Sequence, residues 1–125
     1  MTPTARRKLG DFGESHARRF LEDRGYMFVA ANWTCGAGEL DLVMRHGDEL
    51  VIVEIKTRRG EAMGRAEEAI TPRKAARLLA TAEWFLAEHP AIGDPIWRVD
   101  LIALTLDGAG RVCRSSHIVN AIQAG

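Results

Sequence analysis

The chain has little cysteine and no long apolar run, and both absences narrow its class. Its two cysteines, Cys35 and Cys113, form no metal-binding or redox motif. No apolar segment follows the basic N-terminal residues as it would in a signal peptide, so we expect a cytoplasmic protein with reduced thiols. No stretch is long enough for a transmembrane helix, and we expect no membrane partner. We find no internal repeat and no low-complexity segment.

Net charge is also absent, because 17 basic residues balance 17 acidic ones. The chain as a whole therefore has no general attraction for a polyanion such as nucleic acid. The distribution is uneven, however. Residues 38–54 hold five acids against one arginine, and residues 56–77 hold seven bases against three acids. A metal site that also attracts a polyanion would show this pattern, although an ordinary mixed-charge surface is the alternative.

Several familiar site types are missing. No Ser-His-Asp or Cys-His set is evident, and the four histidines lack metal-ligand spacing. Gly36-x-Gly38 precedes an expected strand rather than a helix, so it predicts a turn and not a phosphate loop. We interpret three tryptophans as core or rim residues rather than platforms for stacking bases: Trp33, Trp84 and Trp97.

The most informative feature is an expected hairpin of residues 38–43 and 51–58. Gly47-Asp48 suits a two-residue hairpin loop. Counting outward from it sets Asp41 opposite Glu54 and Glu39 opposite Lys56, on one face of an otherwise apolar hairpin. Opposed like charges cost stability. A divalent cation would offset them, which is the chemistry of a metal-dependent nuclease.

The remaining pattern predicts one α/β domain over residues 9–125, after a flexible basic arm over residues 1–8. We expect a helix over about 10–24, a strand over 26–30, a turn region over 32–38 and then the hairpin. A helix should begin at Thr71-Pro72 and end near Glu88, with a preceding turn of helix over 66–70 as an option. Strands over about 96–106 and 111–119 complete the order α-β-β-β-α-β-β.

This order, with Asp41 and Glu54-Ile55-Lys56 on a hairpin, resembles the restriction-endonuclease-like fold and its PD-(D/E)XK signature, although Leu40 replaces the proline. A closer resemblance spans nearly the whole chain and is to the bacterial YraN family, which is similar to archaeal Holliday-junction resolvases. It is carried, in order, by Gly10-x-x-Gly13-Glu14, Asn32-Trp33, Gly38-Glu39-Leu40-Asp41-Leu42, Val53-Glu54-Ile55-Lys56-Thr57-Arg58, Glu68-Ala69-Ile70, Arg98-Val99-Asp100-Leu101-Ile102-Ala103 and His117-Ile118-x-Asn120-Ala121.

These patterns suggest a role for each acidic or amine group. Asp41 and Glu54 would bind Mg²⁺ or Mn²⁺, and Lys56 would orient or deprotonate a water or neutralise the transition state. Glu39 would complete the metal shell or pair with Lys56. The resemblance implies that Glu14, on the first helix, adds a metal carboxylate. The alternative for the whole set is a hairpin face of cross-strand ion pairs.

Six basic residues are candidates for binding nucleic-acid phosphates: Arg58, Arg59, Arg65, Arg73, Lys74 and Arg77. The last three lie at the start of the second helix, where pairing with Glu67 and Glu68 is the alternative. Asp100 is at most a residue that orients Lys56 or a neighbouring arginine.

We therefore expect a Mg²⁺-dependent endonuclease that hydrolyses DNA phosphodiester bonds in branched or single-stranded substrates. Junction resolution would need two active sites, hence a homodimer. One alternative is a non-catalytic nucleic-acid-binding module on the same fold. Another is an interaction protein whose acidic cluster pairs with a basic partner.

Overall fold

The computed structural model describes residues 5–60 and 70–122, with side chains from residue 10 onward. Its elements, in chain order, are α1 (Ala5–Glu22), β1 (Met27–Cys35), β2 (Gly38–His46), β3 (Glu49–Arg59), α2 (Pro72–Glu88), the 3₁₀ helix η2 (Pro90–Ile92), β4 (Ile96–Leu106) and β5 (Val112–Ile118). The prediction of an α/β fold with the order α-β-β-β-α-β-β is confirmed. Neither described helix has the length and apolar character that crossing a bilayer requires.

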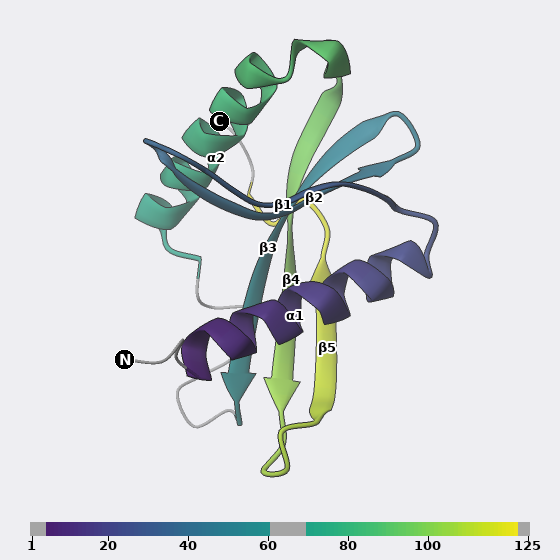
Figure 1. Cartoon of the computed structure of the whole chain (residues 1–125), viewed down its shortest axis with the longest axis vertical. Coiled ribbons are helices and arrows are strands. Elements are labelled where there is room, and N and C mark those ends of the chain that lie inside the picture. Colours follow the sequence, from purple (N-terminus) through teal and green to yellow (C-terminus); the bar gives the residue numbers. More distant parts are fainter. Residues whose placement is uncertain (1–4, 61–69, 123–125) are drawn as a thin grey trace.

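The five strands form one mixed sheet in the order β1-β2-β3-β4-β5 (Figure 1). Strands β3 and β4 are parallel, and the other neighbours are antiparallel. A parallel pair needs a crossover, and α2 supplies it. The long pairing between β3 and β4 makes these two strands the centre of the sheet.

Strand β3 is buried on both faces, as its two-sided apolar pattern predicted. Val51 and Val53 belong to a cluster with Leu21 of α1, whereas Leu50 and Ile52 pack with residues of α2. The helices therefore lie on opposite faces of the sheet, and α1 crosses in front of it in Figure 1. Side chains that alternate along β3 face α1 and α2 in turn.

The start of α2 follows its sequence signals closely. Thr71 is the N-cap, and its hydroxyl accepts a hydrogen bond from the Lys74 amide, while Pro72 occupies the first turn. The helix ends at Glu88, directly before His89 and Pro90. The option of helix over 66–70 lies outside the described residues, apart from Ile70, which is not helical.

Two boundaries differ from expectation. Helix α1 begins at Ala5, inside the segment assigned to the flexible arm. Strand β1 continues to Cys35, although a turn was expected from Asn32 onward. Asn32 does adopt a left-handed conformation, with φ of 52°, but pairing resumes beyond it and the chain turns only at Gly36 and Ala37. This creates a second hairpin, β1–β2.

Asp100 has a structural role that the sequence did not reveal. Its carboxylate is fully buried and accepts bonds from Arg98, from the amide of Asn120 at 2.8 Å and from the ring of His117 at 2.8 Å. These partners join β4, β5 and the segment after β5. Asp100 therefore anchors the C-terminal part of the described chain, and none of these bonds involves Lys56.

Candidate functional site

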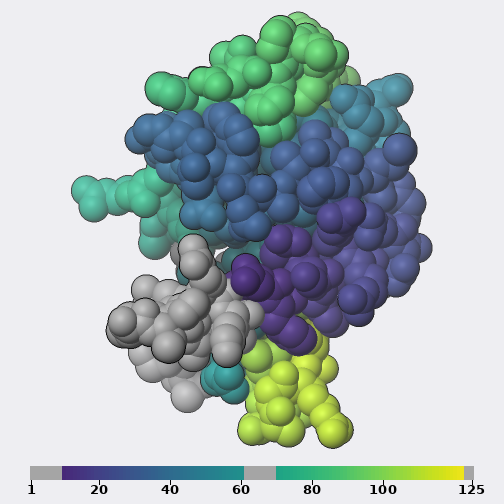
Figure 2. Space-filling model, viewed as in Figure 1, coloured from purple at the N-terminus to yellow at the C-terminus, as the bar shows by residue number. Residues whose placement is uncertain are grey.

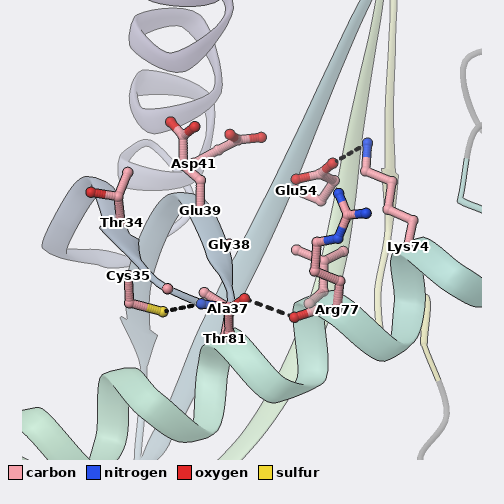
Figure 3. Close-up of a pocket in the computed structure, with 12 residues that line it drawn as sticks. Thr34, Cys35, Ala37, Gly38, Glu39, Asp41, Glu54, Lys74, Arg77 and Thr81 are labelled. Carbon is pink, nitrogen blue, oxygen red and sulfur yellow. Dashed lines mark hydrogen bonds and ion pairs between the residues drawn. The ribbon is translucent and has the colours of Figure 1, made fainter.

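A cleft of about 670 Å³ lies between the β1–β2 turn and α2 (Figure 3). Its walls come from four elements, and the acid pair expected from the sequence contributes to its lining. The lining residues are Thr34, Cys35, Gly36, Ala37, Gly38, Glu39, Asp41, Glu54, Lys74, Arg77, Leu78 and Thr81. The cleft thus combines carboxylates from the sheet with cations from the helix.

The β2–β3 hairpin brings Asp41 and Glu54 together as predicted. His46 pairs with Glu49 across the two-residue loop, and Gly47 has the positive φ of 61° that such a loop requires. The register runs outward to Leu42 and Val53, so the next residues are Asp41 and Glu54. A hydrogen bond between the two side chains brings their carboxyl groups into contact.

The pairing between β2 and β3 ends at Leu42 and Val53, and this changes the environment of Glu39. Beyond Leu42, β2 stays paired with β1 and is no longer paired with β3. Glu39 is exposed, and within residues 5–60 and 70–122 no ion pair joins it to Lys56. Its side chain lies instead beside Asp41 (Figure 3), whose pKa its charge helps to raise.

Asp41 has a strongly altered protonation equilibrium. Burial, followed by the negative charge of Glu54, raises the pKa of Asp41 to about 8, although one of its oxygens accepts a 3.0 Å hydrogen bond from the amide of Ile55. Glu54 is also buried, but Lys74 Nζ lies 2.6 Å from its carboxylate. Because its pKa is about 8, Asp41 holds a proton at neutral pH.

Lys56 lies close to Lys74, but it is not among the residues that line the cleft. Lys56 lies on β3, two residues after Glu54 and on the same face, and it is half-buried. Burial, followed by the nearby charge of Lys74, lowers its pKa. The alternative partners expected for Lys74, Glu67 and Glu68, lie outside the described residues.

Helix α1 approaches the site because residue 13 is a glycine. A Cβ at Gly13 would stand only 2.6 Å from the Thr57 hydroxyl, so a larger residue would push α1 away from β3. Glu14 follows, and it accepts a 3.1 Å hydrogen bond from the side chain of Asn32. Asn32 lies on β1 at the position next to Asp41 of β2, because the residues on either side of it pair with Leu42 and Leu40. Figure 2 shows the β1–β2 hairpin beside α1 on this face of the molecule.

The six candidate phosphate-binding residues are not all in one place. Lys74 and Arg77 line the cleft, and Arg73 is exposed at the start of the same helix. Arg58 has a buried Nε with no hydrogen-bond partner among the described residues. Arg59 lines a separate depression near the β4–β5 turn.

Arg65 falls outside the described residues. Sequence reasoning also missed the wall formed by residues 34–38 and Thr81. The spacing of Lys74, Arg77, Leu78 and Thr81 on one helix face could have indicated it.

Comparison with known proteins places this chain within a family. The model of a family described as "Uncharacterised protein family UPF0102" matches residues 13–104, a range that includes Glu14, Asp41, Glu54 and Lys56. A UPF0102 protein of Roseiflexus castenholzii is 45% identical over 118 residues, covering 94% of this chain and 95% of that protein.

Two further bacterial relatives agree. A UPF0102 protein of Chloroflexus aurantiacus is 43% identical over 120 residues, covering 96% of this chain and 97% of its own. A UPF0102 protein of Pelotomaculum thermopropionicum is 45% identical over 117 residues, covering 94% and 97%. The chain therefore belongs to the UPF0102 family, also called the YraN family, to which its motifs bear a resemblance from Gly10 to Ala121.

Proposed function

We propose that this protein is a metal-dependent nuclease that hydrolyses DNA phosphodiester bonds, in branched or single-stranded DNA. The observation that carries the proposal is the contact of two buried or half-buried carboxyl groups, Asp41 and Glu54, in a cleft that also presents Lys74 and Arg77. Such a pair is costly to hold without a cation, and perturbed carboxyl groups in clefts are typical of functional sites.

The donor set fits Mg²⁺ or Mn²⁺. No group of three His, Cys, Asp or Glu side chains converges within the described parts of the chain. Mg²⁺ needs only one or two protein carboxylates, because it keeps several waters. Asp41 and Glu54 would hold the ion, with Glu39 beside Asp41. Glu14, which would add a further carboxylate, bonds to Asn32 on the strand next to Asp41. When bound, the ion supplies Lewis-acid chemistry at phosphorus and lowers the pKa of water.

The remaining chemistry is assigned to Lys56. A water oxygen forms a bond to phosphorus and the P–O bond to the leaving nucleotide breaks, which gives a phosphate monoester and an alcohol. In this proposal Lys56 Nζ takes the proton of the attacking water, a role that the lowered pKa of Lys56 favours. The leaving oxygen takes a proton from solvent. As an ammonium, the same group would stabilise charge on the phosphoryl oxygens.

Cations from α2 would hold the substrate. Lys74 and Arg77 lie in the cleft next to the acid pair and can bind phosphate oxygens on either side of the reacting one. A protein with no net charge gains little from long-range attraction, so these local contacts should dominate its affinity.

One observation favours a second candidate, a non-catalytic nucleic-acid-binding module. The ammonium of Lys74 already pairs with Glu54 at 2.6 Å and so offsets part of the acid cluster without a metal. A module of this kind would bind nucleic acid without cutting it and would be indifferent to metal ions.

The experiment that separates the two candidates is cleavage of a labelled panel of single strand, duplex, flap and four-way junction. Each substrate is incubated with Mg²⁺, Mn²⁺ or EDTA. The nuclease predicts metal-dependent cutting that is lost in Lys56→Ala and kept in Asp48→Asn, which removes an exposed acid from the same hairpin. Binding without cutting in every condition supports the module. If a junction is the preferred substrate, sedimentation should show a homodimer.

A further inference from the structure

Trp84 differs from the other two tryptophans in its surroundings. Trp33 and Trp97 pack against the core cluster under α2, as the sequence suggested. Trp84 leaves 49% of its surface exposed on α2. An exposed indole beside a cleft can stack its aromatic face against a ring of a ligand. A residue with a purely structural role would not need an exposed aromatic face.

Trp84 lies on the same helix face as the cations of the cleft. Lys74, Arg77, Thr81 and Trp84 are separated by three, four and three residues, which is the spacing of one face of an α-helix. The first three line the cleft. Ten residues of helix span about 15 Å, so this face runs from the acid pair to the indole.

The β1–β2 turn runs along this helix face, from the acid pair past Arg77 to Trp84. Lys74 contacts Glu54 at one end. A Cβ at Gly38 would lie within 3.3 Å of the Arg77 side chain, and a Cβ at Gly36 would lie 3.9 Å from the Trp84 ring. The turn therefore lies next to the edge of the indole, and 49% of the Trp84 surface remains exposed.

From this arrangement we propose that Trp84 is a stacking platform for an unpaired base, and that the face from Lys74 to Trp84 binds single-stranded nucleic acid. Lys74 and Arg77 would bind the phosphates, and the base of a nucleotide a few steps from the acid pair would lie on the indole. In a duplex the bases are already stacked inside the helix, so only an unpaired strand can use this platform.

The charges along this helix face and the rigidity of the Trp84 side chain are consistent with a single strand as the ligand. Arg77 lies between the acid pair and the indole, and Lys74 lies at the acid-pair end, so a phosphate backbone running along this face would meet both cations. Glu88, one turn beyond Trp84, is exposed and acidic, so the binding face ends there. The indole side chain has few rotatable bonds, so stacking on it costs little conformational entropy.

The inference names the substrate class of the proposed nuclease and to that extent rests on it, but the binding it predicts needs neither metal nor cleavage. The test is the affinity of the full chain for a labelled mixed-sequence single strand and for the blunt duplex of the same sequence, in EDTA. Trp84→Ala should weaken single-strand binding about 5- to 150-fold. It should leave duplex binding unchanged, and Trp84→Phe should keep most of the single-strand affinity.

Salt dependence adds a readout that a structural defect would not reproduce. Stacking releases no counterions, so Trp84→Ala should shift log K without changing its slope against log salt. Arg77→Ala should reduce the magnitude of that slope by about 0.7. Ile96→Ala, which shortens another exposed apolar residue at the start of β4, is the matched control and should change neither.

Three results would overturn the inference: no single-strand binding by the wild type at low salt, equal affinity of Trp84→Ala and wild type, or equal losses on single strand and duplex. Self-association that Trp84→Ala abolishes without altering oligonucleotide affinity would also overturn it, because the indole would then cover a second copy of the chain. Cleavage without a Trp84 effect would leave the nuclease intact and remove the platform. Weaker single-strand binding by Trp84→Ala, without cleavage by the wild type, would support the platform and argue against the nuclease.

Discussion

The raised pKa of Asp41 predicts an unusual dependence of stability on pH in the metal-free protein. The folded chain holds a proton on Asp41 up to about pH 8, whereas in the unfolded chain this carboxyl loses it near its ordinary value of 3.8. Between these values the folded state binds one more proton than the unfolded state. The stability supplied by protonated Asp41 is therefore fully present below about pH 4 and is lost as pH rises to 8.

The magnitude follows from the linkage relation. When the folded state binds one extra proton, each unit by which the pH rises lowers the free energy of unfolding by about 1.4 kcal/mol. The loss of stability between pH 5 and pH 7 is therefore about 3 kcal/mol. Asp41→Asn removes the titration and keeps the shape of the protonated acid. Its amide can still donate toward Glu54, and its oxygen can still accept from the amide of Ile55.

The assay is urea unfolding in EDTA at pH 5, 6, 7 and 8. Relative to wild type, Asp41→Asn should gain about 1.4 kcal/mol of stability for each pH unit between pH 5 and pH 7, with a smaller gain from pH 7 to pH 8 as folded Asp41 begins to lose its proton. Asp48→Asn, an exposed acid of the same hairpin, should show a flat difference. A flat or falling difference for Asp41→Asn would refute the account of the acid pair.

Three further predictions follow from other contacts of the structure. Lys74→Met should cost about 2 kcal/mol of stability in EDTA by leaving Glu54 unpaired, and should tighten Mn²⁺ binding in calorimetry because a competing cation is gone; unchanged stability and affinity would contradict this. Gly13→Ala should cost about 1–3 kcal/mol in urea unfolding, and Thr57→Ala should restore part of the loss by removing the atom in the way, whereas additive losses would contradict the close contact. Asp100→Asn should cost about 3–5 kcal/mol because it breaks a buried charge network; a loss of cleavage at full stability would instead place Asp100 in the site.

Local signals allowed much of this fold to be predicted. The register of the β2–β3 hairpin followed from a two-residue glycine turn and from side-chain alternation, and it placed Asp41 beside Glu54. The start of α2 followed from Thr71 and Pro72, which act within one turn of helix. Each of these features depends on residues close in sequence.

Other features could not be predicted because they depend on contacts between distant segments. The pairing of Lys74 with Glu54 requires knowing how α2 crosses the sheet, and nothing near either residue encodes it. The polar β1–β2 region looked like one long turn, since a strand with a left-handed Asn32 has no regular sequence pattern. The partners of Asp100 likewise come from β5 and beyond.

The most direct test of the central claim, that Asp41 and Glu54 together hold a divalent cation, is calorimetric titration of the wild-type protein with Mn²⁺ at pH 7. The titration is repeated in buffers of different ionisation enthalpy, so that proton release is measured with the binding. Because Asp41 is protonated at this pH, we predict one ion per chain and release of about one proton. Both should be lost in Asp41→Asn and Glu54→Gln and kept in Asp48→Asn. Absence of binding to the wild type, or equal binding to all four proteins, would contradict the claim.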